Sequence, residues 1–295
     1  MKQTDSISCQ GPIGVFDSGY GGLTILRHFQ QLLPDYDYIY LGDNARAPYG
    51  TRSFDVVYRF TLEAVSHLFN MGCPLVILAC NTASAKALRS IQQNDLPSID
   101  PSRRVLGIIR PTAEAIGDIS RNGHIGLLAT PGTVRSESYV LEIAKLHPEF
   151  RVSQRECPMF VPLVENREHE SAGADYFVEK YVDQLLGDDP QIDTVILGCT
   201  HYPMLETKIR SAIERHPLAK DRDVTVLCQG ALTAKSLADY LRRHPEMESR
   251  LSRGAAAHYL TTENPSTFSN LASMFMSAPV NAEHTLIPTV SPSEP

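Results

Sequence analysis

The fold is decided by the stretch Leu75-Val-Ile-Leu-Ala-Cys80-Asn-Thr-Ala-Ser84. Its apolar run is too short for most helices, and Cys-Asn-Thr and then Ala-Ser-Ala-Lys follow it directly. This order predicts a buried parallel strand, a tight turn and the start of a helix. Cys80 then lies at the carboxyl end of a strand, which is where open α/β sheets bind their ligands.

The same pattern recurs once, far along the chain. The second copy reads Thr194-Val-Ile-Leu-Gly-Cys199-Thr-His-Tyr-Pro-Met-Leu, and a helix is expected from Glu206. In both copies a strand leads to a cysteine, then to two polar residues, then to a helix. Two strand-end cysteines in matching contexts predict two halves of the molecule that face one cleft.

Strand-like and helix-like runs alternate on either side of these stretches. Strands are expected at 13–17, 38–42, 104–109, 124–130, 150–154 and 224–228. Helices are expected at 23–33, about 53–70, from Pro111, from near Thr133, at 171–186 and at 229–243, and a strand with a short helix at 255–277. Residues 157–165 show no clear periodicity. This alternation predicts mostly parallel sheets that are covered by helices on both faces.

We therefore expect two doubly wound α/β domains with the functional cleft between them. The first domain is expected to comprise residues 1–107 and 228–295, with the second, 108–227, inserted between them. Residues 1–12 resemble a loose arm. The polar, Pro-rich tail from about Ala278 is expected to be mobile because it has little apolar surface to bury.

The bulk composition excludes several classes of protein. The 295 residues are 42% apolar, enough for a large core. No apolar stretch approaches the ~18 residues of a membrane helix, and the N-terminus lacks the apolar region of a signal peptide. We therefore expect a cytoplasmic protein. The net charge of −7 argues against a nucleic-acid-binding surface.

The six cysteines contain no Cys-x-x-Cys pair, which favours free thiols over disulfides or zinc. A cysteine at a strand end is usually a small buried hydrophobe. Four of the six fit that description or lie on the arm: Cys9, Cys73, Cys157 and Cys228. Cys80 and Cys199 differ because polar residues at a helix start follow each of them. Free N–H groups there bind anions, and the helix dipole is expected to lower a thiol pKa from about 8.5.

Other polar residues are expected to border the same cleft. The turn Asp17-Ser18-Gly-Tyr-Gly-Gly22 matches neither of the common phosphate-loop patterns, but its glycines let the backbone approach a ligand. Asp17 is either a cleft residue or a helix cap. The loop from Asp43 to Gly50 follows the second strand. His201 is either a structural histidine or a proton relay beside Cys199, and the sequence alone leaves Glu165 as a surface carboxylate.

A pair of thiols that face one another limits the classes of reaction that the cleft could catalyse. A cysteine phosphatase needs Cys-x₅-Arg, but Lys86 and Leu205 occupy those places. A cysteine protease needs one thiol, and a metal site would need more ligands than Cys199 and His201. Two thiols suit racemisation by two bases, in which one face of a carbon loses a proton and the other face gains one.

The motifs resemble those of glutamate racemases, in the aspartate/glutamate racemase superfamily. The likeness runs from about Ile13 to the helix after Cys228 and comprises four motifs in order: Asp17-Ser18-Gly-x-Gly-Gly22, Gly42-Asp43-x-Ala-Arg-x-Pro48-Tyr49-Gly50, Ala79-Cys80-Asn81-Thr82-Ala83 and Leu197-Gly-Cys199-Thr200-His201-Tyr-Pro-Met-Leu. Aspartate racemases carry a glutamate after the second Cys-Thr, so His201 favours glutamate as the substrate. Two departures are Tyr20, where many members have Val, and Asn44, where many have Thr or Ser.

The resemblance implies two α/β domains related by a pseudo-twofold axis and a reaction that needs no cofactor and no metal. It implies that Cys80 handles the α-proton of D-glutamate and Cys199 that of L-glutamate. Asp17 would assist Cys80, while His201 and Glu165 would assist Cys199. The implied substrate-binding residues are Asp17, Ser18, Tyr49, Gly50, Asn81, Thr82, Thr200 and His201, with Thr130 as a further contributor. The implied biological role is supply of D-glutamate for peptidoglycan, by a homodimer.

Two other functions stay open at this point. One is racemisation of aspartate or another amino acid. The other is a regulator that binds glutamate in the cleft without turning it over.

Overall fold

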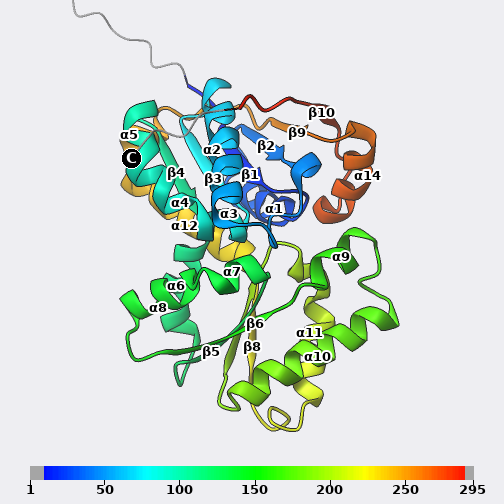
Figure 1. Cartoon of the computed structure of the whole chain (residues 1–295). Coiled ribbons are helices and arrows are strands. Elements are labelled where there is room, and N and C mark those ends of the chain that lie inside the picture. The colour runs from blue at the N-terminus through cyan, green and yellow to red at the C-terminus, as the bar shows by residue number, and fades with distance from the viewer. Residues whose placement is uncertain (1–9, 290–295) are drawn as a thin grey trace, which may run out of the picture.

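The computed structural model describes residues 10–289, which form two lobes, each built on a parallel β-sheet (Figure 1). The strands of the six-stranded sheet have the order β10-β9-β2-β1-β3-β4. Their bounds are β1 (Ile13–Asp17), β2 (Tyr38–Gly42), β3 (Leu75–Leu78), β4 (Arg104–Gly107), β9 (Ala257–Thr261) and β10 (Ala282–His284). The predicted α/β class with parallel sheets is confirmed.

The second sheet has four strands in the order β6-β5-β7-β8. Their bounds are β5 (His124–Ala129), β6 (Arg151–Glu156), β7 (Thr194–Gly198) and β8 (Thr225–Leu227). This order repeats the order β2-β1-β3-β4 of the first sheet. Cys80 follows β3 and Cys199 follows β7, so the two thiols occupy equivalent positions, each beside the first strand of its own sheet.

Every residue of β3 and β7 is buried, as expected for central parallel strands covered on both faces. The covering helices of the first lobe are α1 (Leu23–Leu32), α2 (Phe54–Asn70), α3 (Asn81–Lys86), α4 (Leu88–Ser90), α5 (Leu96–Ile99), α12 (Gln229–Arg243), α13 (Pro245–Glu248) and α14 (Pro265–Met276). Those of the second are α6 (Ile109–Ile119), α7 (Pro131–Arg135), α8 (Ser138–Leu146), α9 (Phe160–Glu165), α10 (Ala172–Asp188) and α11 (Glu206–Arg215). Short turns of other helix types are η1 (Asn44–Arg46), η2 (Ile91–Asp95) and η3 (Tyr202–Leu205). None of the helices within residues 10–289 is long and apolar enough to cross a membrane.

The prediction that the tail from about Ala278 is mobile is wrong for residues 278–289, the part that the structure describes. β10 pairs in parallel with β9, and Val280 is only 3% exposed. The tail is ordered because an edge strand presents free N–H and C=O groups, which even a polar segment can pair with. The prediction of a loose arm is also wrong at Gly11. Its amide donates to the Arg250 carbonyl, and its carbonyl accepts from the Ser252 amide. The rest of the arm, including Cys9, lies outside the described residues.

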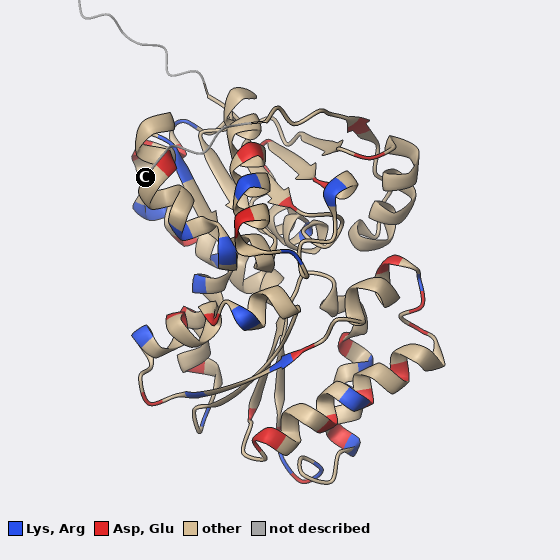
Figure 2. Ribbon diagram, in the orientation of Figure 1, with Lys and Arg blue, Asp and Glu red and all other residues tan. Residues whose placement is uncertain are grey.

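Two further expectations need correction. Residues 157–165, which show no periodicity, contain the short helix α9. Helix α6 begins at Ile109, two residues before the Pro111 that was expected to open it. Proline is tolerated there because the N–H groups of the first turn have no partner within the helix. Acidic and basic residues are interspersed over both lobes (Figure 2).

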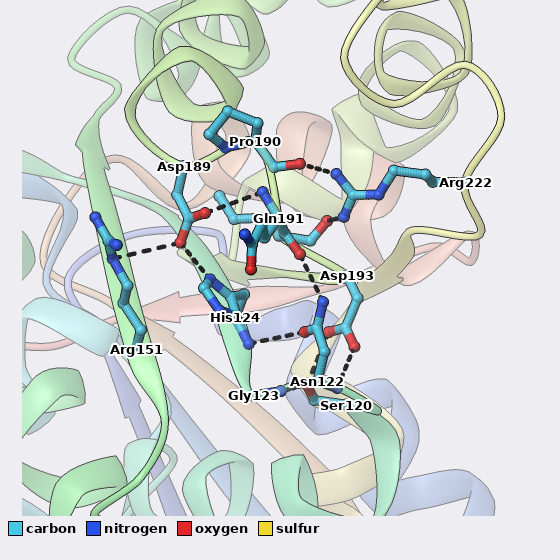
Figure 3. A network of polar contacts seen from close by, with 11 residues as sticks. Ser120, Asn122, Gly123, His124, Arg151, Asp189, Pro190, Gln191, Asp193 and Arg222 are labelled. Carbon is cyan, nitrogen blue, oxygen red and sulfur yellow. Dashed lines mark hydrogen bonds and ion pairs between the residues drawn. The ribbon is translucent and has the colours of Figure 1, made fainter.

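A polar network lies at the amino end of the second sheet, which is the end away from Cys199 (Figure 3). His124 Nδ1 lies 2.8 Å from Asp189 Oδ2, the Gln191 amide donates to Asp189 Oδ1 at 3.0 Å, and Arg151 lies 3.5 Å away. Burial alone would raise the pKa of Asp189, but these contacts hold it below its usual value. The carboxylate therefore stabilises the fold above pH ~4, its unfolded pKa, and loses this effect as the pH falls through its folded value.

Asp189→Asn is therefore expected to lower the free energy of unfolding by about 1–3 kcal/mol at pH 7, since a buried charge-assisted network is lost. The difference from the wild type should shrink below pH ~4, where the wild-type carboxyl is itself protonated. Urea unfolding at the two pH values measures both effects. Asp188→Asn, at a neighbouring residue with a half-exposed side chain, is the control and should cost less than 1 kcal/mol. Equal losses at both pH values would contradict the prediction.

Candidate active site

Cys80 caps the helix that follows its strand. Its Sγ accepts a hydrogen bond from the Ala83 amide at 3.5 Å, and Ser18 Oγ lies 3.5 Å away on the other side. The thiol is 6% exposed. Strand β3 therefore delivers the sulfur to the sheet edge, and the turn after β1 encloses it.

The expected lowering of the Cys80 pKa by the helix start is wrong. Burial, together with the nearby charges of Asp17 and Cys199, raises the pKa of this thiol to about 12. The hydrogen bonds from Ser18 and Ala83 favour the thiolate but do not outweigh burial. Cys80 is therefore a protonated thiol at neutral pH. The charge of Cys199 is among the causes of this rise, which places the second sulfur within electrostatic range of the first.

Asp17 joins the two halves of the site. Its Oδ1 accepts from the Gly19 amide at 2.8 Å, and its Oδ2 accepts from Thr200 Oγ1, across the lobes, at 3.4 Å. Thr24 Oγ1 in turn donates to the Thr200 carbonyl at 3.2 Å. Burial raises the pKa of Asp17, and the charge of His201 and the backbone amides oppose that rise. Asp17 therefore both caps its own turn and contacts the other cysteine loop.

On the second thiol, Cys199 Sγ lies 3.9 Å from His201 Nδ1, and His201 Nε2 lies 3.0 Å from Glu165 Oε1. Burial would lower the pKa of His201, but its contacts with Cys199 and Glu165 raise it to about 10. Both ring nitrogens thus face acceptors, as a charged imidazolium requires. Glu165 ends α9 and belongs to this chain of contacts, although the sequence alone left it at the surface.

The glycine turn fits against the second thiol loop. A Cβ on Gly21 would lie 2.2 Å from Thr200 Oγ1 and 2.5 Å from His201 Nδ1. A Cβ on Gly19 would lie 3.6 Å from Glu165 Oε1. The turn therefore needs glycine at position 21, because only a residue without a side chain lets the lobes meet this closely.

The remaining predicted binding residues lie around the same lobe contact. Thr82 Oγ1 meets Thr130 Oγ1 at 3.0 Å, and Gly50 accepts from the Gly132 amide at 2.7 Å, so both contacts cross between the sheets. The Tyr49 hydroxyl, by contrast, donates to Asp43 within its own loop.

Some residues of the site were missed. Tyr139 and Gln229 contact Asn81. The Phe275 and His201 rings pack nearly perpendicular to one another, with ring centres 5.4 Å apart. Tyr20, noted as a departure from the family, stacks on Phe268 of the same helix α14. Gln229 could have been found, because it follows a strand end as Asn81 does. No sequence signal marks the aromatic residues.

The two cysteines of the site are buried. Both thiols are nearly inaccessible, with Cys199 7% exposed. A cavity of about 690 Å³ lies elsewhere along the lobe boundary, and none of the predicted site residues lines it. Within residues 10–289, no cluster of three or more His, Cys, Asp or Glu side chains could hold a metal ion.

Comparisons with known proteins agree with this geometry. The model of the Asp/Glu/Hydantoin racemase family matches residues 23–237. A glutamate racemase from Ruegeria pomeroyi is 42% identical, over 90% of this chain and 96% of its own length. A glutamate racemase isoform from Bacillus anthracis superposes with a TM-score of 0.82 at 32% identity, covering 95% of this chain and 99% of that one. The Francisella tularensis glutamate racemase in complex with D-glutamate has a TM-score of 0.80 at 29% identity, covering 95% and 97%.

Proposed function

Because the chain belongs to the Asp/Glu/Hydantoin racemase family, we propose that it interconverts L-glutamate and D-glutamate. The reaction proceeds by two bases, without pyridoxal phosphate, as in the family. The observation that carries this proposal is the pair of buried thiols at equivalent ends of β3 and β7. The product serves peptidoglycan synthesis, which is the role of the family.

The two thiols are assigned opposite roles in the proposed reaction. Cys199, paired with the His201 imidazolium, acts as the thiolate that removes the α-proton of L-glutamate. Cys80, whose raised pKa keeps it protonated, delivers its S–H proton to the opposite face and gives D-glutamate. The C–H bond on one face breaks as a C–H bond forms on the other. The two sulfurs have then exchanged states, and the reverse reaction starts from Cys80.

The other residues of the site act on the thiols or the substrate. Asp17 assists proton transfer at Cys80, and Glu165 holds His201 in its charged form beside Cys199. Substrate contacts are assigned to Asp17, Ser18, Tyr49, Gly50, Asn81, Thr82, Thr200 and His201, with Thr130 in addition. Donors at the starts of the helices would anchor the two carboxylates and stabilise the enolate-like charge that develops.

Substrate entry is proposed to involve parting of the lobes. Cys80 and Cys199 are only 6% and 7% exposed, so glutamate would reach them more easily in a more open arrangement. Closing again over the substrate would exclude water and fix the α-carbon between the sulfurs.

The decisive test is circular dichroism of L-glutamate incubated with the purified protein and no added cofactor. Decay of the signal to zero is the expected result. A panel of other amino acids separates glutamate from aspartate as the substrate. Glutamate binding with no decay of the signal would overturn the proposal in favour of a glutamate-binding regulator.

The His201 pKa makes the reaction pH-dependent. Catalytic efficiency with L-glutamate should fall as the pH rises through about 10, because the imidazolium beside Cys199 loses its proton. The same group contributes to stability fully below pH ~6.5, its unfolded pKa, and loses that contribution through about 10.

Glu165→Gln should lower the pH at which kcat/KM falls on the alkaline side (the alkaline limb of the profile) by about one to two units. It removes a charge-assisted contact of about 1.5–3 kcal/mol from the imidazolium. Profiles of kcat/KM against pH for the wild type and the variant measure the shift. Glu168→Gln, at an exposed residue of the following loop, is the control and should leave the limb in place. An unchanged limb in Glu165→Gln would refute the role of Glu165.

The domain boundaries at 107/108 and 227/228 are part of the proposal. They are supported by the strands, since the six-stranded sheet takes its strands from 13–107 and 257–284 and the four-stranded sheet from 124–227. We also propose a cytoplasmic homodimer, on the family likeness. Sedimentation of the purified protein tests the dimer.

A further inference from the structure

We propose that Tyr139 and Gln229 are positioning residues that hold the Asn81 amide in one orientation beside Cys80. This inference rests on the proposed racemase function and names residues that the family motifs do not contain. Asn81 is the residue directly after the thiol, and its backbone begins helix α3. Its side chain is only 2% exposed, so its orientation depends on its neighbours in the protein.

Three side chains form a closed cycle of hydrogen bonds. The Tyr139 hydroxyl donates to Asn81 Oδ1 at 2.6 Å, Asn81 Nδ2 donates to Gln229 Oε1 at 2.8 Å, and Gln229 Nε2 donates to the Tyr139 hydroxyl at 2.6 Å. Each group is both a donor and an acceptor, an arrangement in which the bonds polarise and strengthen one another. Burial raises the pKa of Tyr139 far above its usual value, so the hydroxyl keeps the proton that it donates.

A backbone carbonyl sets the direction of the cycle. Gln229 Nε2 also lies 3.2 Å from the Ile108 carbonyl oxygen and 2.8 Å from Thr112 Oγ1. The Thr112 hydroxyl donates its own hydrogen to the same Ile108 carbonyl at 3.1 Å. A carbonyl can only accept, so Nε2 must face it and Oε1 must face Asn81. A flipped Asn81 amide would then place two oxygens against each other. The orientation of Asn81 is thus fixed through Gln229.

This orientation leaves one N–H of Asn81 available. Among residues 10–289, the second hydrogen of Asn81 Nδ2 has no hydrogen-bond acceptor. A donor in a fixed orientation on the residue next to the thiol suits a substrate carboxylate or the negative charge that develops on it. The cycle also joins the lobes, since Asn81 follows β3 of the first sheet and Tyr139 lies on α8 of the second lobe.

The test is a double-mutant cycle with glutamate turnover in both directions as the readout. Tyr139→Phe should lower kcat/KM about 10-fold for both enantiomers, the effect of one hydrogen bond of about 1.4 kcal/mol. Asn81→Ala should lower it about 30-fold. The double variant should match Asn81→Ala within about twofold, because without Asn81 there is no amide left to orient. Gln229→Met, which keeps the length but loses both polar atoms, should behave as Tyr139→Phe does.

The matched control is Tyr38→Phe, which removes another buried hydroxyl. That hydroxyl donates to the carbonyls of Leu33 at 2.9 Å and Phe29 at 3.4 Å, away from the site. It should change thermal stability about as much as Tyr139→Phe and leave kcat/KM unchanged. Additive losses in the double variant, or full activity of Tyr139→Phe, would overturn the positioning role alone. A wild-type protein without any turnover would overturn the proposed function and this inference with it.

Discussion

Cys199→Ala is expected to abolish racemisation, with a fall of at least about 10⁴-fold in kcat from either enantiomer. The variant lacks the base for one face of the α-carbon, because among residues 10–289 the cysteine that contacts His201 is Cys199. Cys80→Ala should be equally inactive, because the opposite face then has no acid. Both losses are measured by circular dichroism of each pure enantiomer.

The two variants are expected to differ in hydrogen exchange with D₂O. Cys199→Ala retains Cys80 and should exchange the α-hydrogen of D-glutamate slowly, while L-glutamate stays unlabelled. Cys80→Ala should show the reverse preference. NMR of the α-proton assigns each sulfur to its face.

Cys73→Ala is the control for both variants. Cys73 is a fully buried cysteine just before β3, at the amino end of the strand that carries Cys80 at its carboxyl end. It should cost stability but leave kcat within a factor of about two, because it takes part in packing only. Racemisation that survives at wild-type rate in either active-site variant would rule out the two-thiol mechanism.

Gly21→Ala is expected to have the next largest effect, a fall of about 100-fold in kcat/KM together with about 1–3 kcal/mol of lost stability. The new methyl group would lie 2.2 Å from Thr200 Oγ1 and 2.5 Å from His201 Nδ1. Both neighbours are buried, at 4% and 5% exposure, so neither has room to withdraw. The lobes would have to shift, and the two thiol loops would lose their mutual placement. Steady-state kinetics and urea unfolding measure the two effects.

Gly187→Ala is the matched control for that substitution. Gly187 lies in α10 with nothing within 4 Å of an added Cβ, so alanine should be neutral or slightly stabilising there. Wild-type kinetics in Gly21→Ala would show that the turn does not hold the site together.

The sequence was sufficient to predict the fold class and to propose Cys80 and Cys199 as the reactive pair. The runs at 75–78 and 194–198 are short, apolar and followed by polar residues at helix starts, a pattern that only a buried parallel strand accommodates well. Because strand ends in such sheets meet at one edge, Cys80 and Cys199 could be predicted as a pair before any coordinates were known. Local periodicity likewise placed α2, α10 and α12 to within two residues.

Only the tertiary structure decided the electrostatics and the contacts of these residues. The helix start by itself predicts a low Cys80 pKa, but burial and Asp17 reverse that direction, and burial is not a local property of the sequence. Glu165 lies 36 residues before its partner His201. Tyr139 and Gln229 reach Asn81 from 58 and 148 residues away. Chain connectivity places no such pairs together. The sequence by itself therefore determined which residues are candidates for the site, and the packing of the two lobes decided their contacts, charge and orientation.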